Sequence, residues 1–184
     1  MNNSYSAGIL LYKIISGTIV VLLGCDSRYK CWSDFGGKCE WIDGKDPCRT
    51  AAREFYEETS GVISSENILY DMLKKHGICV KCRSYHNNDY FMFLLSEDYV
   101  HVHKDYDIDF KNQQMILSYT KHRDMSRYKE KNNIRWISLE HVIHSPRMFR
   151  GVFSESIKQN YDMILKNAYT FKKTFPIYNH SVNN

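Results

Sequence analysis

The feature that most constrains this chain is a set of three glutamates, Glu54, Glu57 and Glu58, placed just after a glycine pair. On an α-helix, positions i, i+3 and i+4 lie on one face, so these carboxylates would converge on one patch. Such a patch is costly unless a positive partner neutralises it, and carboxylate oxygens are the ligands that hard cations such as Mg²⁺ prefer. The sequence therefore predicts a turn followed by a helix whose acidic face binds a cation.

Both ends of this helix are marked in the sequence. Asp46 is a suitable N-cap, Pro47 occupies the first helical position, where its missing N–H costs nothing, and Gly61 can close the C-terminus. We therefore predict a helix from about 47 to 60. Its apolar face consists of Cys48, Ala51, Ala52 and Phe55. A helix with one apolar and one acidic face has a side to bury and a side to present.

A solvated surface helix with an acidic stripe is the alternative interpretation of these charges. Arg53 lies four residues before Glu57 and could pair with it on such a helix. That interpretation leaves the glycine pair, Lys38 and Glu40, all just ahead of the helix, without a reason. The combination of glycine turn and acidic helix favours a functional site.

These residues resemble the Nudix box, the signature of the Nudix hydrolase family. The box has a glycine, five residues, a glutamate, seven residues, and then Arg-Glu-aliphatic-any-Glu-Glu-any-Gly-aliphatic. The matching positions in this chain are Gly37, Arg53, Glu54, Glu57, Glu58, Gly61 and Val62. The chain departs from the box in two extra residues before Arg53, one extra residue before Gly61, and Phe55 at an aliphatic position. Asp43 stands where the box has its first glutamate.

The resemblance implies a fold and a domain organisation. It implies an α/β fold, a Nudix-type α/β/α sandwich with a mixed β-sheet, in which the box forms a loop–helix–loop. It covers most of residues 1–184, with 98–133 as its weakest part, and we interpret the chain as one domain with a polar, frayed tail at 175–184.

The hydrophobic pattern predicts individual elements without reference to any family. Predicted strands are 6–15 and 18–24, joined as a hairpin, then 78–85, 90–95 after a turn at 86–89, and 134–137. Predicted helices are 65–75, for which a strand is the alternative, a short helix capped by Ser138, and an amphipathic helix at 153–169.

The chemistry that the resemblance implies is attack of water on a phosphorus of a diphosphate linkage, with Mg²⁺ or Mn²⁺ as cofactor. Glu57 and Glu58 would bind the metal directly, together with the backbone carbonyl of Gly37. Glu54 would act as the base or hold a metal-bound water, and it counts among both the catalytic and the metal-binding candidates. Arg53 completes the catalytic candidates.

A further acidic metal ligand is expected from a loop before the late tryptophan-containing strand. Glu130, six residues before Trp136, stands at that position, and Glu97 and Asp98 at the end of a strand compete with it.

Two basic residues are candidates for substrate binding. Lys38 could contact a phosphate or be a simple surface charge. Arg28, with Tyr29 and Trp32 nearby in the chain, could meet a phosphate and a base. Aromatic residues in such a segment are otherwise typical of a core.

Several functions stay open at this stage. A small nucleotide substrate, such as an NTP, a dinucleoside polyphosphate or a nucleotide sugar, competes with capped RNA. Decapping would need a basic track, for which 121–131 is the visible candidate, and a net charge of +4 is too mild to indicate nucleic-acid binding by itself. A Nudix-like binding module without catalysis and a zinc protein using the cysteines are further alternatives. We prefer the small substrate.

The six cysteines bear on the compartment. The chain has no recognisable export signal and no apolar run approaching ~18 residues, so we expect neither secretion nor a membrane span. We therefore interpret the cysteines as reduced thiols and expect a reducing, cytoplasmic location, which would be the host cytoplasm if the AT-rich character of the sequence reflects a large DNA virus.

Overall fold

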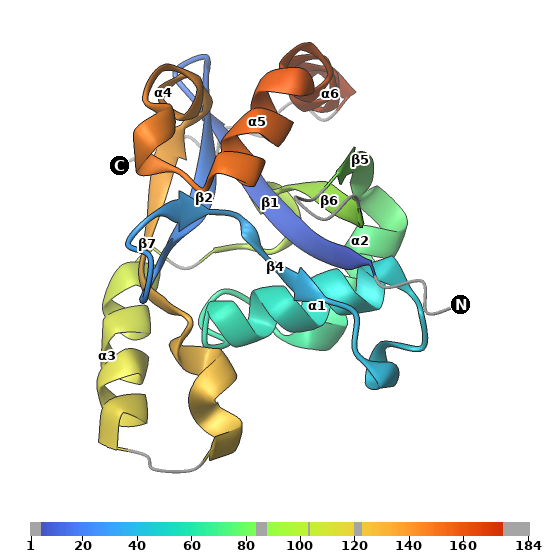
Figure 1. Ribbon diagram of the computed structural model, residues 1–184. Coiled ribbons are helices and arrows are strands. Elements are labelled where there is room, and N and C mark those ends of the chain that lie inside the picture. Colours follow the sequence, from blue (N-terminus) through green and yellow to red (C-terminus); the bar gives the residue numbers. More distant parts are fainter. Residues whose placement is uncertain (1–4, 84–87, 103, 120–122, 175–184) are drawn as a thin grey trace, which may run out of the picture.

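The computed structural model describes residues 5–83, 88–102, 104–119 and 123–174, and in it a β-sheet lies between two groups of helices (Figure 1). The strands are β1 (Ser6–Ile15), β2 (Thr18–Asp26), β3 (Trp32–Ser33), β4 (Phe35–Lys38), β5 (Ile78–Arg83), β6 (Asp89–Ser96) and β7 (Lys131–Ser138). The helices are α1 (Pro47–Glu58), α2 (Glu66–His76), α3 (Tyr106–Tyr119), α4 (Leu139–His144), α5 (Gly151–Gln159) and α6 (Tyr161–Thr174). Short 3₁₀ turns are η1 (Trp41–Asp43), η2 (Glu97–Tyr99), η3 (Arg123–Lys129) and η4 (Pro146–Met148).

The sheet is mixed, and two different strands pair with the same edge of β1. β1 runs parallel to β6 on one edge. On the other edge its first residues, from Ser6 to Ile9, pair with β4, whereas Tyr12 to Ile15 pair with β2. β2 then continues away from β1 and pairs with β7. The strand that carries the glycine pair is therefore held against the centre of the sheet.

Both faces of the sheet are covered by helices. Along β1, Ala7 and Ile9 belong to a core shared with α1, α2 and α3, whereas Leu10 and Tyr12 belong to a core shared with α4, α5 and α6. This alternation follows from the strand geometry, in which successive side chains point to opposite faces. The predicted α/β/α sandwich with a mixed sheet is confirmed.

One predicted helix is two helices. The pattern at 153–169 predicts a continuous helix, but the chain breaks at Asn160, between α5 and α6. The Asn160 side-chain amide donates to the carbonyl of Ser156 at 2.9 Å, and its own carbonyl accepts from Ile164 N–H at 2.9 Å. Asn160 thus closes α5 and starts α6, and the apolar face continues across the break.

Helix α3 was not predicted. Its sequence lacks a clear apolar face, because Phe110 and Leu117 are buried while Ile116 and Tyr119 are exposed. The hairpin, α1, α2, α4 and the strands at 90–95 and 134–137 are confirmed, the last being longer than predicted. The strand alternative for 65–75 is wrong. Most of the predicted turn at 86–89, the end of the strand at 84–85 and the tail at 175–184 lie outside the described residues.

Candidate functional site

Helix α1 is fixed in position at both ends, as the sequence predicts. Asp46 caps its start, since Asp46 Oδ1 accepts from the N–H of Cys48 at 2.9 Å. At its end Gly61 has a φ of +71°, in the left-handed region that favours glycine, and its N–H donates to the carbonyl of Tyr56 at 2.8 Å. Ala51 and Phe55 are fully buried against the sheet, so the acidic face of the helix turns toward β4.

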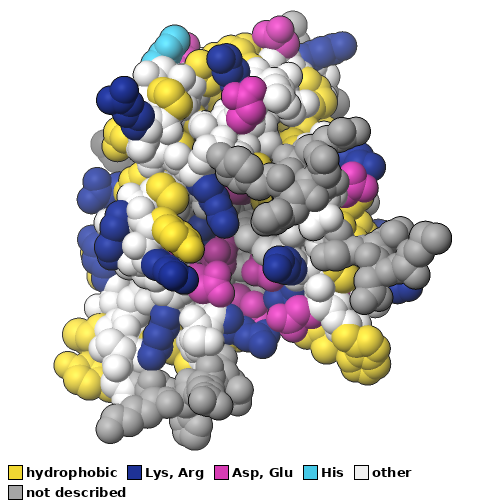
Figure 2. Space-filling view, in the orientation of Figure 1, with side chains coloured by type: hydrophobic (Ala, Val, Ile, Leu, Met, Phe, Trp, Pro, Cys, Tyr) yellow, Lys and Arg dark blue, Asp and Glu magenta, His cyan; other side chains and the backbone are white. Residues whose placement is uncertain are grey.

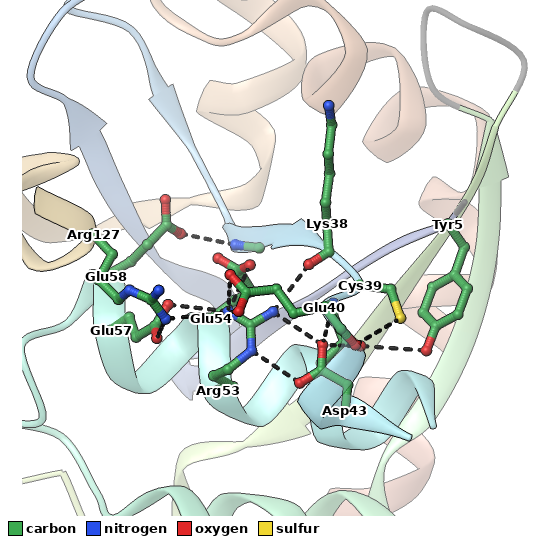
Figure 3. Close-up of polar contacts among 12 residues, drawn as sticks. Tyr5, Lys38, Cys39, Glu40, Asp43, Arg53, Glu54, Glu57, Glu58 and Arg127 are labelled. Carbon is green, nitrogen blue, oxygen red and sulfur yellow. Dashed lines mark hydrogen bonds and ion pairs between the residues drawn. The ribbon is translucent and has the colours of Figure 1, made fainter. Parts of the chain in front are cut away.

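The glycine pair allows β4 to approach these carboxylates closely (Figure 3). A Cβ on Gly37 would lie 2.5 Å from the Glu54 carboxylate, so a side chain there would clash. The N–H of Gly36 donates to Glu58 Oε2 at 2.8 Å. Glycine at these two positions therefore brings the strand backbone into contact with the acidic helix.

Arg53 is a buried brace at the centre of the cluster. Its Nε and Nη2 donate to the two oxygens of Asp43 at 2.9 and 3.0 Å, and Nη2 also donates to the carbonyl of Lys38 at 2.9 Å. Its Nη1 lies 3.1 Å from Glu57 Oε2 and 3.0 Å from Glu54 Oε1. Although burial opposes it, the hydrogen bonds from Arg53 hold the pKa of Asp43 below its ordinary value. The guanidinium is thus occupied in holding the loop, the strand and the helix together.

Two further cations reach the glutamates, and the sequence analysis did not assign them to the site. Arg127 Nη1 in η3 lies 2.7 Å from Glu57 Oε1 (Figure 3), and Lys131 Nζ at the start of β7 lies 3.4 Å from Glu58 Oε1. Both belong to the basic stretch considered as an RNA track. In Figure 2 acidic and basic side chains gather together in the middle of this face, where α1 and β4 lie in Figure 1.

The cations do not fully offset the acidic cluster. Burial raises the pKa of Glu58 to about 8, and the charges of Glu54 and Glu130 add to the rise while Lys131 opposes it. Burial likewise raises the pKa of Glu54 to about 7; Arg53 opposes the rise and Glu57 and Glu130 add to it. Glu54 and Glu58 are therefore the carboxylates that gain most from an added positive charge.

The donor set suits a hard divalent cation. It consists of carboxylate oxygens with the backbone of Gly37 beside them, the ligand chemistry that Mg²⁺ prefers. Across the described ranges no three Asp, Glu, His or Cys side chains are arranged as a metal centre, and Glu57 and Glu58 contact an arginine and a lysine. The residues that would hold a cation are Gly37, Glu54, Glu57 and Glu58. The cation would replace Arg127 as the partner of Glu57.

Glu130 lies near this cluster. It immediately precedes β7, and its carbonyl accepts from the N–H of Ser27 at 2.8 Å. Its charge contributes to the raised pKa values of both Glu54 and Glu58. Its side chain is exposed, so it can reach a ligand that arrives from solvent.

Glu97 and Asp98 lie elsewhere. They belong to η2, which follows β6, and Glu97 pairs with Lys13 at 2.9 Å near the end of β1 that is remote from β4. Asp98 accepts from the hydroxyl of Ser96 at 3.0 Å. Of these three acids, Glu130 is the one whose charge contributes to the raised pKa values of Glu54 and Glu58.

The two candidates for substrate binding lie apart from the glutamates. The side chain of Lys38 points away from the carboxylates, although its carbonyl accepts from Arg53 (Figure 3). Arg28 is exposed in the turn after β2, where its N–H donates to Asp26 Oδ1 at 2.8 Å and its guanidinium lies 5.2 Å from the ring of Tyr29. Lys38 reaches a neighbouring cavity, whereas the described contacts of Arg28 are all within its own turn.

All six cysteines are free thiols. Cys79 is exposed and Cys82 is buried. Within the described part of the chain, no helix is both long and apolar enough to cross a membrane.

Comparison with solved structures identifies the fold. The Ap4A hydrolase of C. elegans, in a binary complex, superposes with a TM-score of 0.50 at 17% identity, over 92% of this chain and 99% of that one. A candidate Nudix hydrolase from Listeria monocytogenes gives a TM-score of 0.50 at 10% identity, over 89% and 96% of the two chains. The C-terminal domain of mouse MUTYH, in complex with human PCNA, gives 0.52 at 11% identity, over 87% and 88%. The chain has the α/β fold of these structures, and at such identities the likeness establishes the fold alone.

No family model and no curated protein matches the sequence.

Proposed function

We propose that this chain is a Mg²⁺-dependent hydrolase of the Nudix type, which cleaves the diphosphate linkage of a small nucleotide such as an NTP, a dinucleoside polyphosphate or a nucleotide sugar. The observation that carries the proposal is the position of the acidic face of α1 beneath a glycine strand, where a Cβ on Gly37 would lie 2.5 Å from the Glu54 carboxylate and the N–H of Gly36 donates to Glu58. Added positive charge stabilises the ionised carboxylates of such a cluster, and a divalent cation would supply it.

Each residue of the cluster has a role in this proposal. Glu57, Glu58 and the carbonyl of Gly37 hold Mg²⁺ or Mn²⁺. When bound, the cation neutralises phosphate charge and makes water more acidic. Glu54, whose carboxylate lies against Gly37, accepts a proton from the attacking water or holds a metal-bound water. Arg53 keeps Glu57 oriented through their 3.1 Å contact.

Two alternatives have less support. Capped RNA would require a basic track that leads away from the site, yet Arg127 pairs with Glu57 and Lys131 is buried against Glu58. A binding module without catalysis would not need three braced glutamates under a glycine strand. Residues 121 and 122 of the basic stretch lie outside the described part.

The decisive experiment is a substrate screen. The purified protein is incubated with NTPs, dinucleoside polyphosphates, nucleotide sugars and capped RNA, with Mg²⁺, with Mn²⁺ and with excess chelator, and the products are identified by mass. We expect metal-dependent cleavage of a small nucleotide between two phosphates. Full activity in chelator would remove the metal from the proposal, and cleavage of capped RNA alone would replace the small substrate.

A further inference from the structure

A cavity of about 360 Å³ adjoins the carboxylate cluster. Its walls come from the start of β1, from β4, from β6 and from α5, and its lining includes Gly36, Gly37 and Lys38 of β4. The cavity therefore shares β4 with the acidic cluster. Its volume falls within the range of small-molecule sites, which runs from roughly 300 to 1,000 Å³.

The two glycines of β4 make this shared wall thin. A Cβ on Gly37 would meet Glu54, whereas a Cβ on Gly36 would lie 2.5 Å from the hydroxyl of Tyr90, which lines the cavity. Successive residues of a strand point to opposite faces, so the two glycines let β4 pack closely against Glu54 on one face and against Tyr90 on the other. The cavity is therefore separated from the carboxylates by the backbone of β4, and Gly37 borders both.

The interior of the cavity holds a buried acid. Asp34 is 7% exposed, it lines the cavity, and its Oδ2 accepts from the hydroxyl of Tyr90. Burial raises the pKa of Asp34, against opposing effects from Tyr90, Lys131 and Arg150. Asp34 therefore places a buried hydrogen-bond acceptor at the wall of the cavity.

A polar connection runs from the cavity to the catalytic cluster. Lys131 Nζ donates to the hydroxyl of Ser33 at 2.8 Å and to the carbonyl of Asp34 at 3.3 Å, and the same ammonium lies 3.4 Å from Glu58 Oε1. Ser33 and Asp34 both line the cavity. The position of the cavity relative to Glu58 is therefore fixed by a buried lysine.

The remaining lining is suited to an amphipathic anion. Met92 and Phe153 are buried and present apolar surface, whereas Lys38 and Arg150 are exposed cations. Arg150 is held in place by its N–H, which donates to the carbonyl of Trp32 at 2.9 Å. Apolar walls, one buried acceptor group and two cations toward solvent match a flat heterocycle that carries phosphate.

We propose that this cavity binds the nucleoside of the substrate, that Asp34 accepts hydrogen bonds from an amino group of the base, and that Lys38 and Arg150 contact the phosphates. The inference rests on the function proposed above and narrows its substrate class to nucleotides with an amino-bearing base. A carboxylate only accepts hydrogen bonds, so it attracts an exocyclic amino group and repels a carbonyl oxygen at the same place. Asp34 is a specificity-determining residue in this proposal.

The test compares bases that differ in this one group. Binding of AMP against IMP, and of CMP against UMP, is measured by calorimetry in excess chelator at pH 8, so that neither metal nor turnover contributes. We expect the amino-bearing nucleotide of each pair to bind about tenfold tighter or better, the range of a good hydrogen-bonded base contact. Equal affinities within both pairs, or no nucleotide binding, would overturn the proposal.

Variants then test which residues cause the difference in affinity within each pair. The asparagine of Asp34→Asn offers both a donor and an acceptor, so the ratio of the two affinities within each nucleotide pair should fall close to one. Asp162→Asn, the same change on the exposed start of α6, is the control and should leave this ratio unaltered. Lys38→Met and Arg150→Met should weaken all four nucleotides alike. An unchanged ratio in a folded Asp34→Asn protein would remove Asp34 from recognition. If Asp34→Asn does not fold, the wild-type ratios still decide whether the proposal stands.

Failure of the proposed function has a different signature from failure of this inference. Selective binding in chelator without cleavage in Mg²⁺ would leave the cavity as a nucleotide site and refute the hydrolase. Metal-dependent cleavage with no discrimination within the base pairs would keep the hydrolase and refute the role of Asp34.

Discussion

The guanidinium of Arg127 lies 2.7 Å from one oxygen of Glu57, while Arg53 contacts the other oxygen at 3.1 Å. The two arginines differ in how many other contacts hold them beside Glu57. Arg53 is buried and also holds Asp43 and the Lys38 carbonyl, whereas the Arg127 side chain is 41% exposed. The turn that carries Arg127 is itself anchored, because Gln114 donates to the carbonyl of Tyr128 at 2.6 Å. Arg127 therefore contacts Glu57 from a more exposed position than Arg53, on a turn that Gln114 holds.

We predict that Arg127→Gln makes Mn²⁺ bind more tightly to the nucleotide-free protein. A divalent cation must displace Arg127 from Glu57. Glu57 is buried and Arg127 is partly exposed, so the pair should contribute about 1 kcal/mol, the upper end for solvent-accessible ion pairs, and the gain should be about fivefold. Titration followed by electron paramagnetic resonance of free Mn²⁺ measures it. Arg49→Gln removes the same charge from an exposed position of α1, beside the ring of Tyr70, and should have no effect. Weaker Mn²⁺ binding to Arg127→Gln would contradict the exchange.

A second prediction concerns turnover. Glu57→Gln or Glu58→Gln removes a charged oxygen and keeps the size of the side chain, so kcat should fall by at least ~10²-fold, as for other groups at a reacting centre. Steady-state kinetics with the substrate found in the screen measures the fall, and thermal melting checks the fold. Glu155→Gln, on the exposed face of α5, should turn over normally. Near-normal rates for both box variants would favour the binding module.

The parts of the site that the sequence predicts are those encoded locally. The caps of α1 and the convergence of Glu54, Glu57 and Glu58 follow from spacing within one helix, and the structure has both. Arg127 and Lys131 could not be placed in this way, because their contacts with Glu57 and Glu58 depend on how the segment at 123–131 packs against α1 and β2. Their basic character was visible, but the pattern of charges does not say which acids they meet.

The same limit explains the errors in the fold. Helix α3 buries only Phe110 and Leu117 deeply, so its amphipathic signal is weak. The break at Asn160 depends on one side-chain hydrogen bond within a continuous apolar pattern. Asp43, which departs from the box, is explained by its two hydrogen bonds from Arg53 and by those from the N–H of Glu40 and the hydroxyl of Thr50. Its shorter side chain still provides the acceptor that the arginine needs.

A third prediction is that the metal-free protein loses stability as pH rises toward 8. The pKa of Glu54 rises to about 7 and that of Glu58 to about 8, from an ordinary value of 4.5. The folded state therefore favours the neutral carboxyls. Their contribution to stability is fully present below pH 4.5 and is lost as pH rises through the folded pKa values.

Thermal melting in chelator should accordingly show a lower Tm at pH 8.5 than at pH 6, with Mg²⁺ restoring stability at pH 8.5. Glu58→Gln removes one titrating group, so its Tm should depend less on pH, whereas Glu155→Gln should behave as the parent protein. An identical pH dependence in Glu58→Gln would show that Glu58 does not cause the loss.

A fourth prediction concerns the contribution of Asp43 to stability, which is separate from catalysis. Asp43→Asn gives Arg53 Nε and Nη2 a neutral partner while Glu54 and Glu57 still contact Nη1, so the loss is that of buried hydrogen bonds to a charged group and costs about 1–3 kcal/mol. Urea unfolding should show this loss with an unchanged slope. Asp162→Asn, on an exposed helix start, should stay within about 0.5 kcal/mol of the parent. A fully stable Asp43→Asn protein would mean that Arg53 is held by its other contacts.

The last prediction ranks Glu130 against Glu97 and Asp98 as the additional acid of the site. The charge of Glu130 raises the pKa values of Glu54 and Glu58, whereas Glu97 is paired with Lys13 near the far end of β1. An exposed acid beside a cluster already rich in carboxylates is unfavourable in the free protein and becomes favourable once a cation arrives. Glu130→Gln should therefore raise Tm in chelator slightly and lower kcat at limiting Mg²⁺.

Glu97→Gln and Asp98→Asn should leave kcat unchanged, and Glu97→Gln should lower Tm slightly, because it removes the charge that Lys13 contacts at 2.9 Å. Kinetics over a range of Mg²⁺ concentrations distinguishes the two positions, since a residue that helps to hold the cation affects the rate most where Mg²⁺ is scarce. A Glu130→Gln protein with the parent's rate at every Mg²⁺ concentration would leave the three glutamates of α1 to hold the metal without it.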